Sequence, residues 1–216
     1  MSNPWESIES ICAAGPVIPV LVIEDADQAI PLAAALLAGG LCVLEVTLRT
    51  PAALAAVARI AAELPAACVG VGSVIEPEQF SAAARAGARF AVSPGATPEL
   101  AAAACAQALP WLPGAQTVSE VMALRAQGYR RMKLFPAGAL DGLAFLRSIA
   151  GPIPDVRFCP TGGITPANAA DYLRLANVAC IGGSWLTPAA LIAERRWPDI
   201  SALARQAGTL RPSLPR

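Results

Sequence analysis

The stretch CVLEVTLRTPAALAAVARIAAEL, residues 42–64, contains the repeating unit on which the fold prediction rests. Its first part, Cys42–Leu48, is a short apolar run typical of a strand that is covered on both faces of a parallel sheet. The alanine-rich run Pro51–Leu64 follows, and a proline at its start favours a helix. The stretch therefore predicts one strand–helix unit of an α/β protein.

The same alternation recurs along the 216 residues of the chain. The strand-like runs are Val17–Ile23, Cys42–Leu48, Cys68–Val74, Phe90–Ser93, Ala108–Leu112, Arg131–Phe135, Val156–Cys159 and Ala179–Ile181. The helical runs include Ala26–Ala38, Pro51–Leu64, Glu76–Ala86, Pro98–Ala106 and Val118–Gln127. Eight such units fit a closed (β/α)8 barrel or an open doubly wound sheet. We expect the (β/α)8 TIM barrel, because no GxGxxG motif follows the first strand.

The chain shows no linker-like change of composition, so we expect a single (β/α)8 domain over residues 1–216. Residues 1–15 predict an extra N-terminal helix and residues 208–216, which contain two prolines, a loose C-terminal tail. Although the mean hydropathy is +0.52, the uncharged stretches 29–44 and 100–119 are interrupted by Pro and Gly or Gln. With no secretion signal visible, we expect a cytoplasmic protein without a membrane segment.

Composition excludes several kinds of chemistry. The chain has no histidine, which rules out Ser-His-Asp and Cys-His catalysis and His-ligated zinc. Its 16 basic residues balance its 16 acidic ones, so charge indicates no nucleic-acid partner. The six cysteines lack metal-ligand spacing and are interpreted as buried, reduced thiols, with no metal and no cofactor expected.

Lys133 is the only lysine, because the other basic residues are all arginine. It lies between Met132 and Leu134 in a strand-like run. Arginine keeps its proton, whereas a lysine in an apolar setting can present an uncharged amine. We therefore interpret Lys133 as a nucleophile that forms a Schiff base with a carbonyl, rather than as a lysine whose amine simply extends to solvent.

Other polar residues occur where strands end, which is where the active site of a (β/α)8 barrel lies. Glu45 is the one acidic residue in a predicted strand. We interpret it as a general acid/base, and the alternative is that it forms an ion pair with an arginine. The planar guanidinium of Arg49 is suited to binding a carboxylate through two hydrogen bonds. The alternative is that Arg49 lies at the rim of the site and has no role. The glycine turns at 162–163 and 182–184 indicate a phosphate site, although tight turns also require glycine.

Six motifs closely resemble those of the 2-keto-3-deoxy-6-phosphogluconate (KDPG) aldolase family. They are EVTLRT (45–50), VGSV (71–74), SPG (93–95), KLFPA (133–137), FCPTGGI (158–164) and IGGSW (181–185). The resemblance implies a homotrimer of barrels and a class I enzyme of the Entner–Doudoroff pathway. Such an enzyme cleaves its substrate to pyruvate and glyceraldehyde 3-phosphate and often acts on 4-hydroxy-2-oxoglutarate. Relatives that act on galactonate-series substrates lack the EVTLRT and CPTGGI motifs, so the gluconate-series substrate is favoured.

The resemblance also implies roles for individual residues. Lys133 would be the Schiff-base lysine and Glu45 the proton acceptor and donor. The substrate-binding residues would be Arg49 and Ser73 for the pyruvate carboxylate, Pro94 and Phe135 for the pocket wall, Thr161 for stereochemical preference, and Gly162, Gly163, Gly183 and Ser184 for the phosphate. Family members commonly carry Thr where this chain has Ser73, and some have a first-strand arginine where it reads Val20-Leu21-Val22.

Two other functions remain open on the residues themselves. A metal-free sugar-phosphate isomerase would use Glu45 as its base and form no covalent intermediate. A binding protein for a phosphorylated ligand would need the glycine turns but not Lys133. A covalent adduct between pyruvate and Lys133 separates the aldolase from both.

Overall fold

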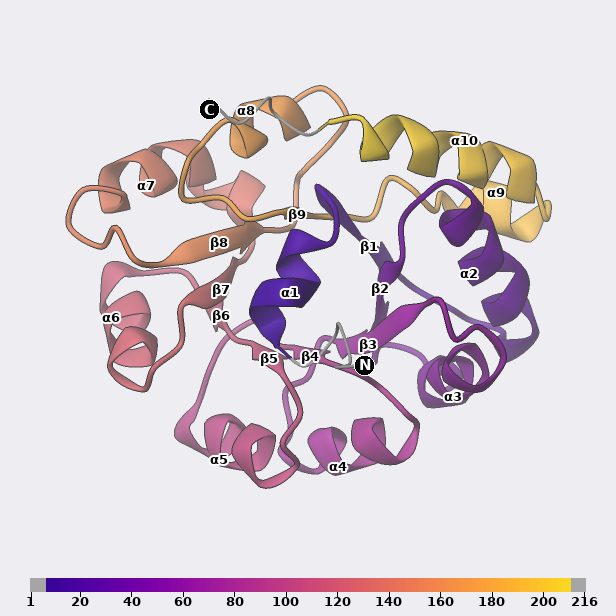
Figure 1. Ribbon diagram of the computed structural model, residues 1–216, viewed down its shortest axis with the longest axis horizontal. Coiled ribbons are helices and arrows are strands. Elements are labelled where there is room, and N and C mark those ends of the chain that lie inside the picture. Colours follow the sequence, from indigo (N-terminus) through magenta and orange to yellow (C-terminus); the bar gives the residue numbers. More distant parts are fainter. Residues whose placement is uncertain (1–6, 211–216) are drawn as a thin grey trace.

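The computed structural model describes residues 7–210 and, within them, nine short parallel strands with helices around the outside (Figure 1). The strands are β1 (Val17–Leu21), β2 (Val43–Thr47), β3 (Cys68–Gly72), β4 (Ala91–Val92), β5 (Trp111–Leu112), β6 (Gly114–Ala115), β7 (Arg131–Leu134), β8 (Arg157–Pro160) and β9 (Ile181–Gly183). The parallel strand–helix alternation predicted from residues 42–64 is therefore present along the chain.

The strands form two sheets, so the expected closed eight-stranded (β/α)8 TIM barrel is wrong. One sheet has the order β5-β4-β3-β2-β1-β9, and the other has the order β6-β7-β8. The predicted strand Ala108–Leu112 is replaced by β5, which pairs with β4, and by β6, which pairs with β7. Between β8 and β9, the described residues form two isolated bridges, Phe158 to Val178 and Thr161 to Gly182, rather than a ladder.

Prolines lie at both breaks between the sheets. Pro113 separates β5 from β6, and Pro160 stands between the two isolated bridges at the end of β8. A proline has no backbone N–H, so it cannot donate to a continuing ladder. The strand count read from apolar runs did not take account of these interruptions.

The helices begin and end close to the predicted positions. They are α1 (Ile8–Ala13), α2 (Ala29–Ala38), α3 (Ala53–Glu63), α4 (Glu78–Arg85), α5 (Pro98–Ala106), α6 (Val118–Ala126), α7 (Gly142–Ile149), α8 (Ala169–Leu173), α9 (Ala189–Ala193) and α10 (Trp197–Gly208), with 3-10 turns η1 (Ala26–Gln28) and η2 (Ala137–Leu140). Thr97 caps α5 by accepting a hydrogen bond from the Leu100 N–H, with Pro98 as its first residue. This is the favoured geometry for a Thr-Pro helix start.

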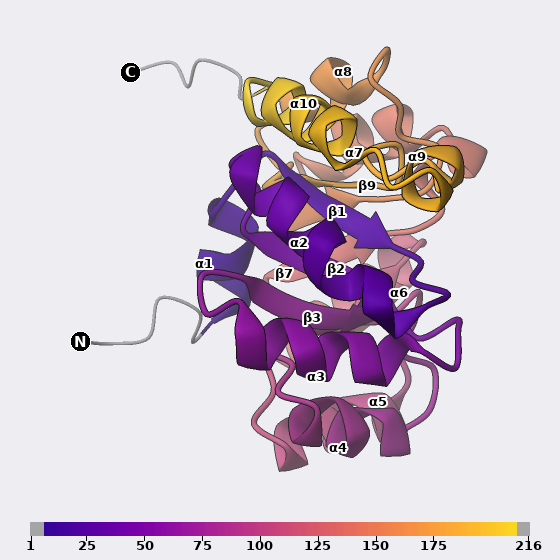
Figure 2. The same cartoon turned by 90° about the vertical axis from the view of Figure 1, so that its right-hand side faces the viewer.

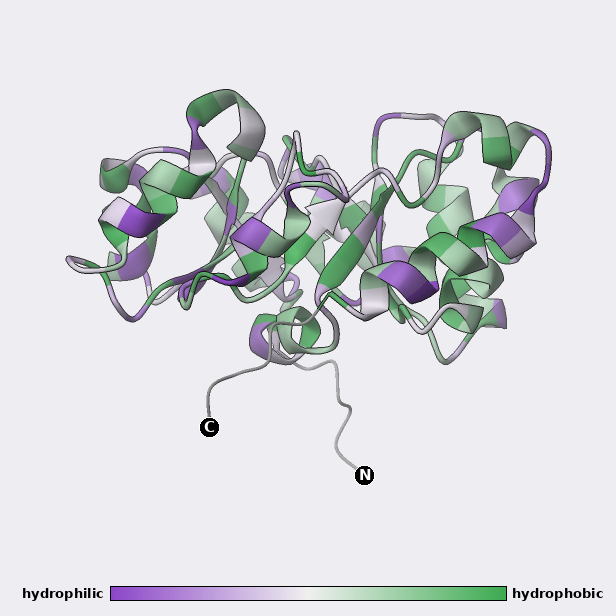
Figure 3. Cartoon of the chain, turned by 90° about the horizontal axis from the view of Figure 1, so that it is seen from above, coloured by the Kyte–Doolittle hydropathy of each residue, from purple (hydrophilic) through white to green (hydrophobic). Residues whose placement is uncertain are grey.

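Two apolar clusters fill the molecule on opposite faces of the sheets. The larger one packs the helices against the outward-facing strand residues, and hydrophilic residues lie on the outer helix turns (Figure 3). The smaller cluster lies inside and joins Phe90 and Leu112 to the thiols of Cys12, Cys159 and Cys180. Cys12 comes from α1, which lies across the N-terminal ends of the strands (Figure 2). Polar side chains are thereby left to the opposite, C-terminal half of the interior.

The predictions for the chain ends stay predictions, because part of each end lies outside the described range. Helix α1 falls within the expected N-terminal helix, and α10 continues to Gly208, where the loose tail was expected to start. The predictions made for residues 1–6 and 211–216 concern residues outside the range that the structure describes. No helix between residues 7 and 210 is long and apolar enough to cross a membrane. The single-domain assignment stays a prediction.

Candidate active site

Lys133 and Glu45 form a buried ion pair between the two sheets. The Lys133 amine donates a hydrogen bond of 3.1 Å to Glu45 Oε1, across 88 residues of sequence. Their side chains are 5% and 4% exposed. The strand period explains the geometry: Met132 and Leu134 face the outer cluster, as do Leu44 and Val46, so the residues between them point inward. The sequence prediction that these two residues share a site is supported by this contact.

The surroundings of the Lys133 amine are largely uncharged. Its Nζ lies 5.4 Å from the centroid of the Phe135 ring. In the sheet, Lys133 pairs with Gly114 on one side and with Cys159 on the other. Pro94 lies against Gly114, where an added Cβ would come within 2.1 Å of the Pro94 carbonyl oxygen. Phe135 therefore lies near the amine, and Pro94 lies beside β6, the strand that pairs with the strand of Lys133.

Arg49 and Ser73 form a second contact, just beyond the ends of β2 and β3. The Arg49 Nε donates to Ser73 Oγ at 3.0 Å. Ser73 adopts a left-handed conformation with φ of 60°, which turns the chain sharply at the end of β3. This contact uses only the Nε–H, so the four N–H groups on the two terminal nitrogens of the guanidinium can bind a carboxylate.

Thr161 follows β8 and is buried, with its hydroxyl 3.3 Å from the Cys159 carbonyl oxygen. Gly162 and Gly163 come next, with φ of 86° and 77°. This left-handed backbone strains other residues, so glycine is required there for the turn itself. An added Cβ on Gly162 would lie 3.0 Å from the Phe135 ring, which places the turn beside the pocket wall.

Gly183 ends β9, and the exposed Ser184 follows it. Between residues 7 and 210, no hydrogen bond or ion pair connects Gly183 or Ser184 to Lys133, Glu45 or Arg49. They adjoin the site through Gly182, whose bridge to Thr161 brings the end of β9 beside the end of β8. The glycine turns predicted for phosphate are thus neighbours of each other but separate from the amine.

Gly72 has a place in the site that was not predicted from the sequence, and Gly182 was predicted only as part of a phosphate-binding turn. An added Cβ on Gly72 would lie 2.1 Å from Glu45 Oε1, and one on Gly182 would lie 2.2 Å from the Thr161 hydroxyl oxygen. Gly182 lies inside β9 and Gly72 ends β3, and glycine weakens a strand unless another group approaches closely. That position is the signal that could have identified them.

The thiols of the interior are poor competitors for the role of nucleophile. Hydrogen bonding to Cys12 and Cys159, together with burial, raises the pKa of the Cys180 thiol well above its usual range. Burial raises the pKa of Cys68 to about 12. A thiol reacts as its thiolate, so these groups are inert near neutral pH. In the part of the chain that the structure describes, no group of His, Cys, Asp and Glu residues could hold a metal ion.

A buried lysine amine hydrogen-bonded to a buried carboxylate provides the nucleophile and the proton carrier that a Schiff-base-forming carbon–carbon lyase requires. The sequence profile of the family described as KDPG and KHG aldolase, KHG being 4-hydroxy-2-oxoglutarate, matches residues 8–203. The chain belongs to this family and is therefore an aldolase.

Three relatives show how closely the chain follows that family. It is 50% identical to the KHG/KDPG aldolase of Escherichia coli strain K12 over 207 residues, which are 96% of this chain and 97% of that protein. Two structures cover nearly all of both chains. One is KDPG aldolase from Legionella pneumophila with pyruvate captured as a covalent carbinolamine (TM-score 0.91, 46% identity, 96% and 99% coverage). The other is KDPG aldolase of Zymomonas mobilis ZM4 with 3-phosphoglycerate (0.89, 45%, 97% and 98%).

Proposed function

We propose that this chain cleaves KDPG to pyruvate and glyceraldehyde 3-phosphate through a Schiff base on Lys133, and that it also cleaves 4-hydroxy-2-oxoglutarate to pyruvate and glyoxylate. The observation that carries the proposal is the 3.1 Å contact between the buried Lys133 amine and the buried Glu45 carboxylate. The pairing supplies both a nucleophile and a proton carrier at one point.

The first half of the reaction joins the substrate to the enzyme. Glu45 takes a proton from the Lys133 ammonium, and the uncharged amine then attacks the C2 carbonyl; the C–N bond forms while a proton moves from nitrogen to the carbonyl oxygen, giving a carbinolamine. Glu45 then gives its proton to the carbinolamine hydroxyl, which leaves as water, and the lysine nitrogen becomes doubly bonded to C2 in an iminium. The Legionella relative, in which pyruvate was captured as a carbinolamine, supports this order of events.

The second half breaks the C3–C4 bond. Glu45, directly or through a water molecule, takes the proton of the C4 hydroxyl, and the aldehyde leaves as the bonding electrons move into the iminium to give an enamine. Glu45 then returns a proton to C3, which restores an iminium, and water releases pyruvate and the free amine. One carboxylate thus carries a proton away and brings one back, and the chain needs no histidine for this.

The remaining residues hold the two ends of the substrate. Arg49, oriented by Ser73, binds the carboxylate next to C2, while Pro94 and Phe135 enclose the reacting carbons. Thr161 lies next to the leaving aldehyde and influences its stereochemistry. The backbone N–H groups of the glycine turns and the Ser184 hydroxyl bind the phosphate, namely at Gly162, Gly163, Gly183 and Ser184. The Zymomonas relative, whose structure contains 3-phosphoglycerate, supports a phosphate site in the family.

We also infer, from the family resemblance alone, a homotrimer of single-domain subunits that works in the cytoplasm. Sedimentation equilibrium of the purified protein tests the assembly, and a mass of one or two subunits would overturn it.

The test of the function is reductive trapping. The protein is incubated with pyruvate, reduced with borohydride, digested and mapped by mass spectrometry. Because Lys133 is the only lysine, the N-terminal amine is the one other group that can form the adduct. We expect the adduct on the peptide that contains Lys133. Its absence would overturn the proposal, and isomerisation of a sugar phosphate without an adduct would favour the isomerase.

A further inference from the structure

Gly72 is the last residue of β3 and lies directly beside the Glu45 side chain. An added Cβ would lie 2.1 Å from Glu45 Oε1, 2.6 Å from Cγ and 2.7 Å from Cδ. These are the three nearest atoms, and all belong to Glu45. Since three atoms of that side chain are involved, a rotation of the carboxylate alone would not relieve the overlap.

The backbone of Gly72 does not itself call for glycine. The residue is not among the glycines with positive φ, and it pairs in regular register with Thr47 of β2. Other residue types adopt such a strand conformation without strain. Glycine has no side chain to pack in a strand, so a requirement for space rather than for conformation explains it here.

We propose that Gly72 is a positioning residue for the proton carrier of this enzyme. The missing side chain leaves the volume in which the Glu45 carboxylate lies, and so sets the 3.1 Å distance between Oε1 and the Lys133 amine. Gly72 acts through Glu45 and does not itself take part in bond making. The proposal rests on the proposed function, because it concerns the proton transfers that Glu45 performs.

Gly70 provides a matched control on the same strand. It lies two residues earlier on the same face, and an added Cβ there would be 2.4 to 2.6 Å from three carbon atoms of the Phe90 ring. Phe90 belongs to the inner apolar cluster and not to the site. Gly70→Ala therefore introduces the same methyl group and a comparable overlap, but it displaces a core ring instead of the carboxylate.

The experiment compares Gly72→Ala with Gly70→Ala in three measurements: borohydride trapping of pyruvate, exchange of the pyruvate methyl protons with deuterated solvent, and thermal unfolding. For Gly72→Ala we expect the adduct at Lys133 to persist, while the exchange rate per adduct falls at least tenfold, a part of the roughly 10²–10⁴-fold effect that general acid–base catalysis supplies. For Gly70→Ala we expect a lower Tm with exchange per adduct within about twofold of the original chain.

Unchanged exchange in Gly72→Ala, or an equal loss in both variants, would overturn the proposal. If Gly72→Ala does not fold, the same substitution is made in Glu45→Ala, where the overlapping atoms are gone. In that background, Gly72→Ala should leave Tm equal, within experimental error, to the Tm of Glu45→Ala alone. A further large decrease in Tm would overturn the proposal. Absence of any adduct in the original chain would instead count against the proposed function, so the two failures are distinguishable.

Discussion

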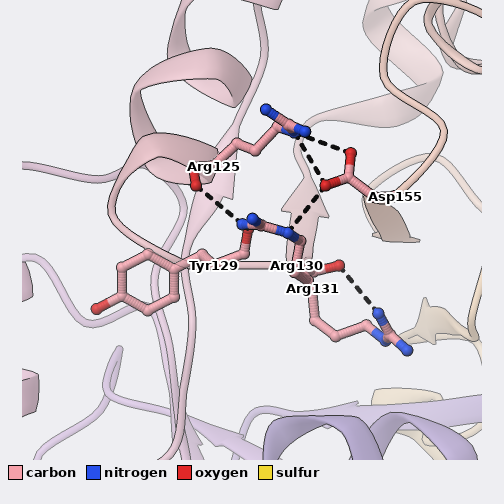
Figure 4. Close-up of polar contacts among 5 residues, drawn as sticks. All are labelled: Arg125, Tyr129, Arg130, Arg131 and Asp155. Atoms are coloured by element: carbon pink, nitrogen blue, oxygen red, sulfur yellow. Dashed lines mark hydrogen bonds and ion pairs between the residues drawn. The ribbon is translucent and has the colours of Figure 1, made fainter.

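Strand β7 has an ion pair on its inner side, between the sheets, and a group of two ion pairs that share one aspartate at the edge where β7 and β8 begin. At that edge Arg125 and Arg130 hold Asp155 through contacts of 2.8 Å and 3.0 Å (Figure 4), with all three side chains 37–47% exposed. The inner pair, Lys133 with Glu45, has the longer contact of 3.1 Å but is about 95% buried on both sides. Judged by contact distance alone, the exposed contacts would be taken as the more important for function, whereas the buried pair is the one in the candidate active site.

The difference lies in how much water each pair retains. An exposed pair contributes little to stability, because water and salt screen it. Burying an ion pair costs desolvation free energy, and the attraction between the two charges does not always offset that cost. A buried ion pair by itself is therefore weak evidence of a contribution to stability. What burial does supply is a reactive amine and a proton carrier kept apart from bulk water. The outer contacts therefore contribute little to stability, and the inner pair matters for chemistry.

The largest effect is expected from Lys133→Arg. The positive charge beside Glu45 is retained, so the chain should fold, but a guanidinium forms no Schiff base with a ketone. Cleavage of KDPG, followed by a coupled assay for pyruvate, should fall to background, and the borohydride adduct should disappear. Retained cleavage in a folded variant would show that the covalent step does not occur at Lys133.

Glu45→Gln should slow proton transfer while leaving covalent capture in place. The amide has the size of the carboxylate but cannot accept the proton, so exchange of the pyruvate methyl protons, followed by NMR, should slow about 10²–10⁴-fold. The adduct at Lys133 should still form. The control is Glu24→Gln, an exposed carboxylate outside the site, and exchange that is unaffected in Glu45→Gln would assign the proton transfers to another group.

Ser73→Ala tests whether the serine orients Arg49. Loss of one hydrogen bond worth ~0.5–1.5 kcal/mol should raise the pyruvate concentration for half-maximal trapping by about two- to tenfold. The rate of methyl exchange at saturating pyruvate should stay the same, because Glu45 and Lys133 are untouched. Ser81→Ala, which removes an exposed hydroxyl on α4, is the control, and an equal change in both variants would contradict the assignment.

The smallest effect is expected from Asp155→Asn at the outer pair. The hydrogen bond from Arg125 lowers the pKa of Asp155 in the folded protein. A lowered pKa means that the carboxylate stabilises the fold above its unfolded-state pKa of about 3.9, and that this contribution is lost as pH falls through the folded-state value. At pH values above about 5, Asp155→Asn should therefore lower Tm slightly. The difference in Tm between the variant and the original chain should become smaller as the pH falls.

The pairing with Arg125 can be checked in the same series. Asp155→Asn made in an Arg125→Gln background should shift Tm less than it does in the original chain, because the main partner is already gone. A Tm difference that grows toward low pH would contradict the sign derived for Asp155. Full activity is expected in both variants, since the pair lies outside the site.

Much of the site could be predicted from residue types. A single lysine among sixteen basic residues, in an apolar run, identified Lys133, and the one carboxylate in a strand identified Glu45. Period-two alternation then placed both on the inner face, because their neighbours are apolar. The contact of Arg49 with Ser73 and the spatial role of Gly72 could not be predicted, since each depends on how two separate strand ends approach each other in space.

The sequence by itself determined the alternation of strands and helices, the absence of histidine chemistry and the family, because these depend on residue types and their order. The tertiary structure decided how the strands close. Pro113 and Pro160 interrupt the ladder, so two sheets form in place of a continuous barrel. It also decided that residues 88 positions apart share a hydrogen bond. Such contacts depend on the packing of whole strands, and no local pattern specifies the distance between two sheets.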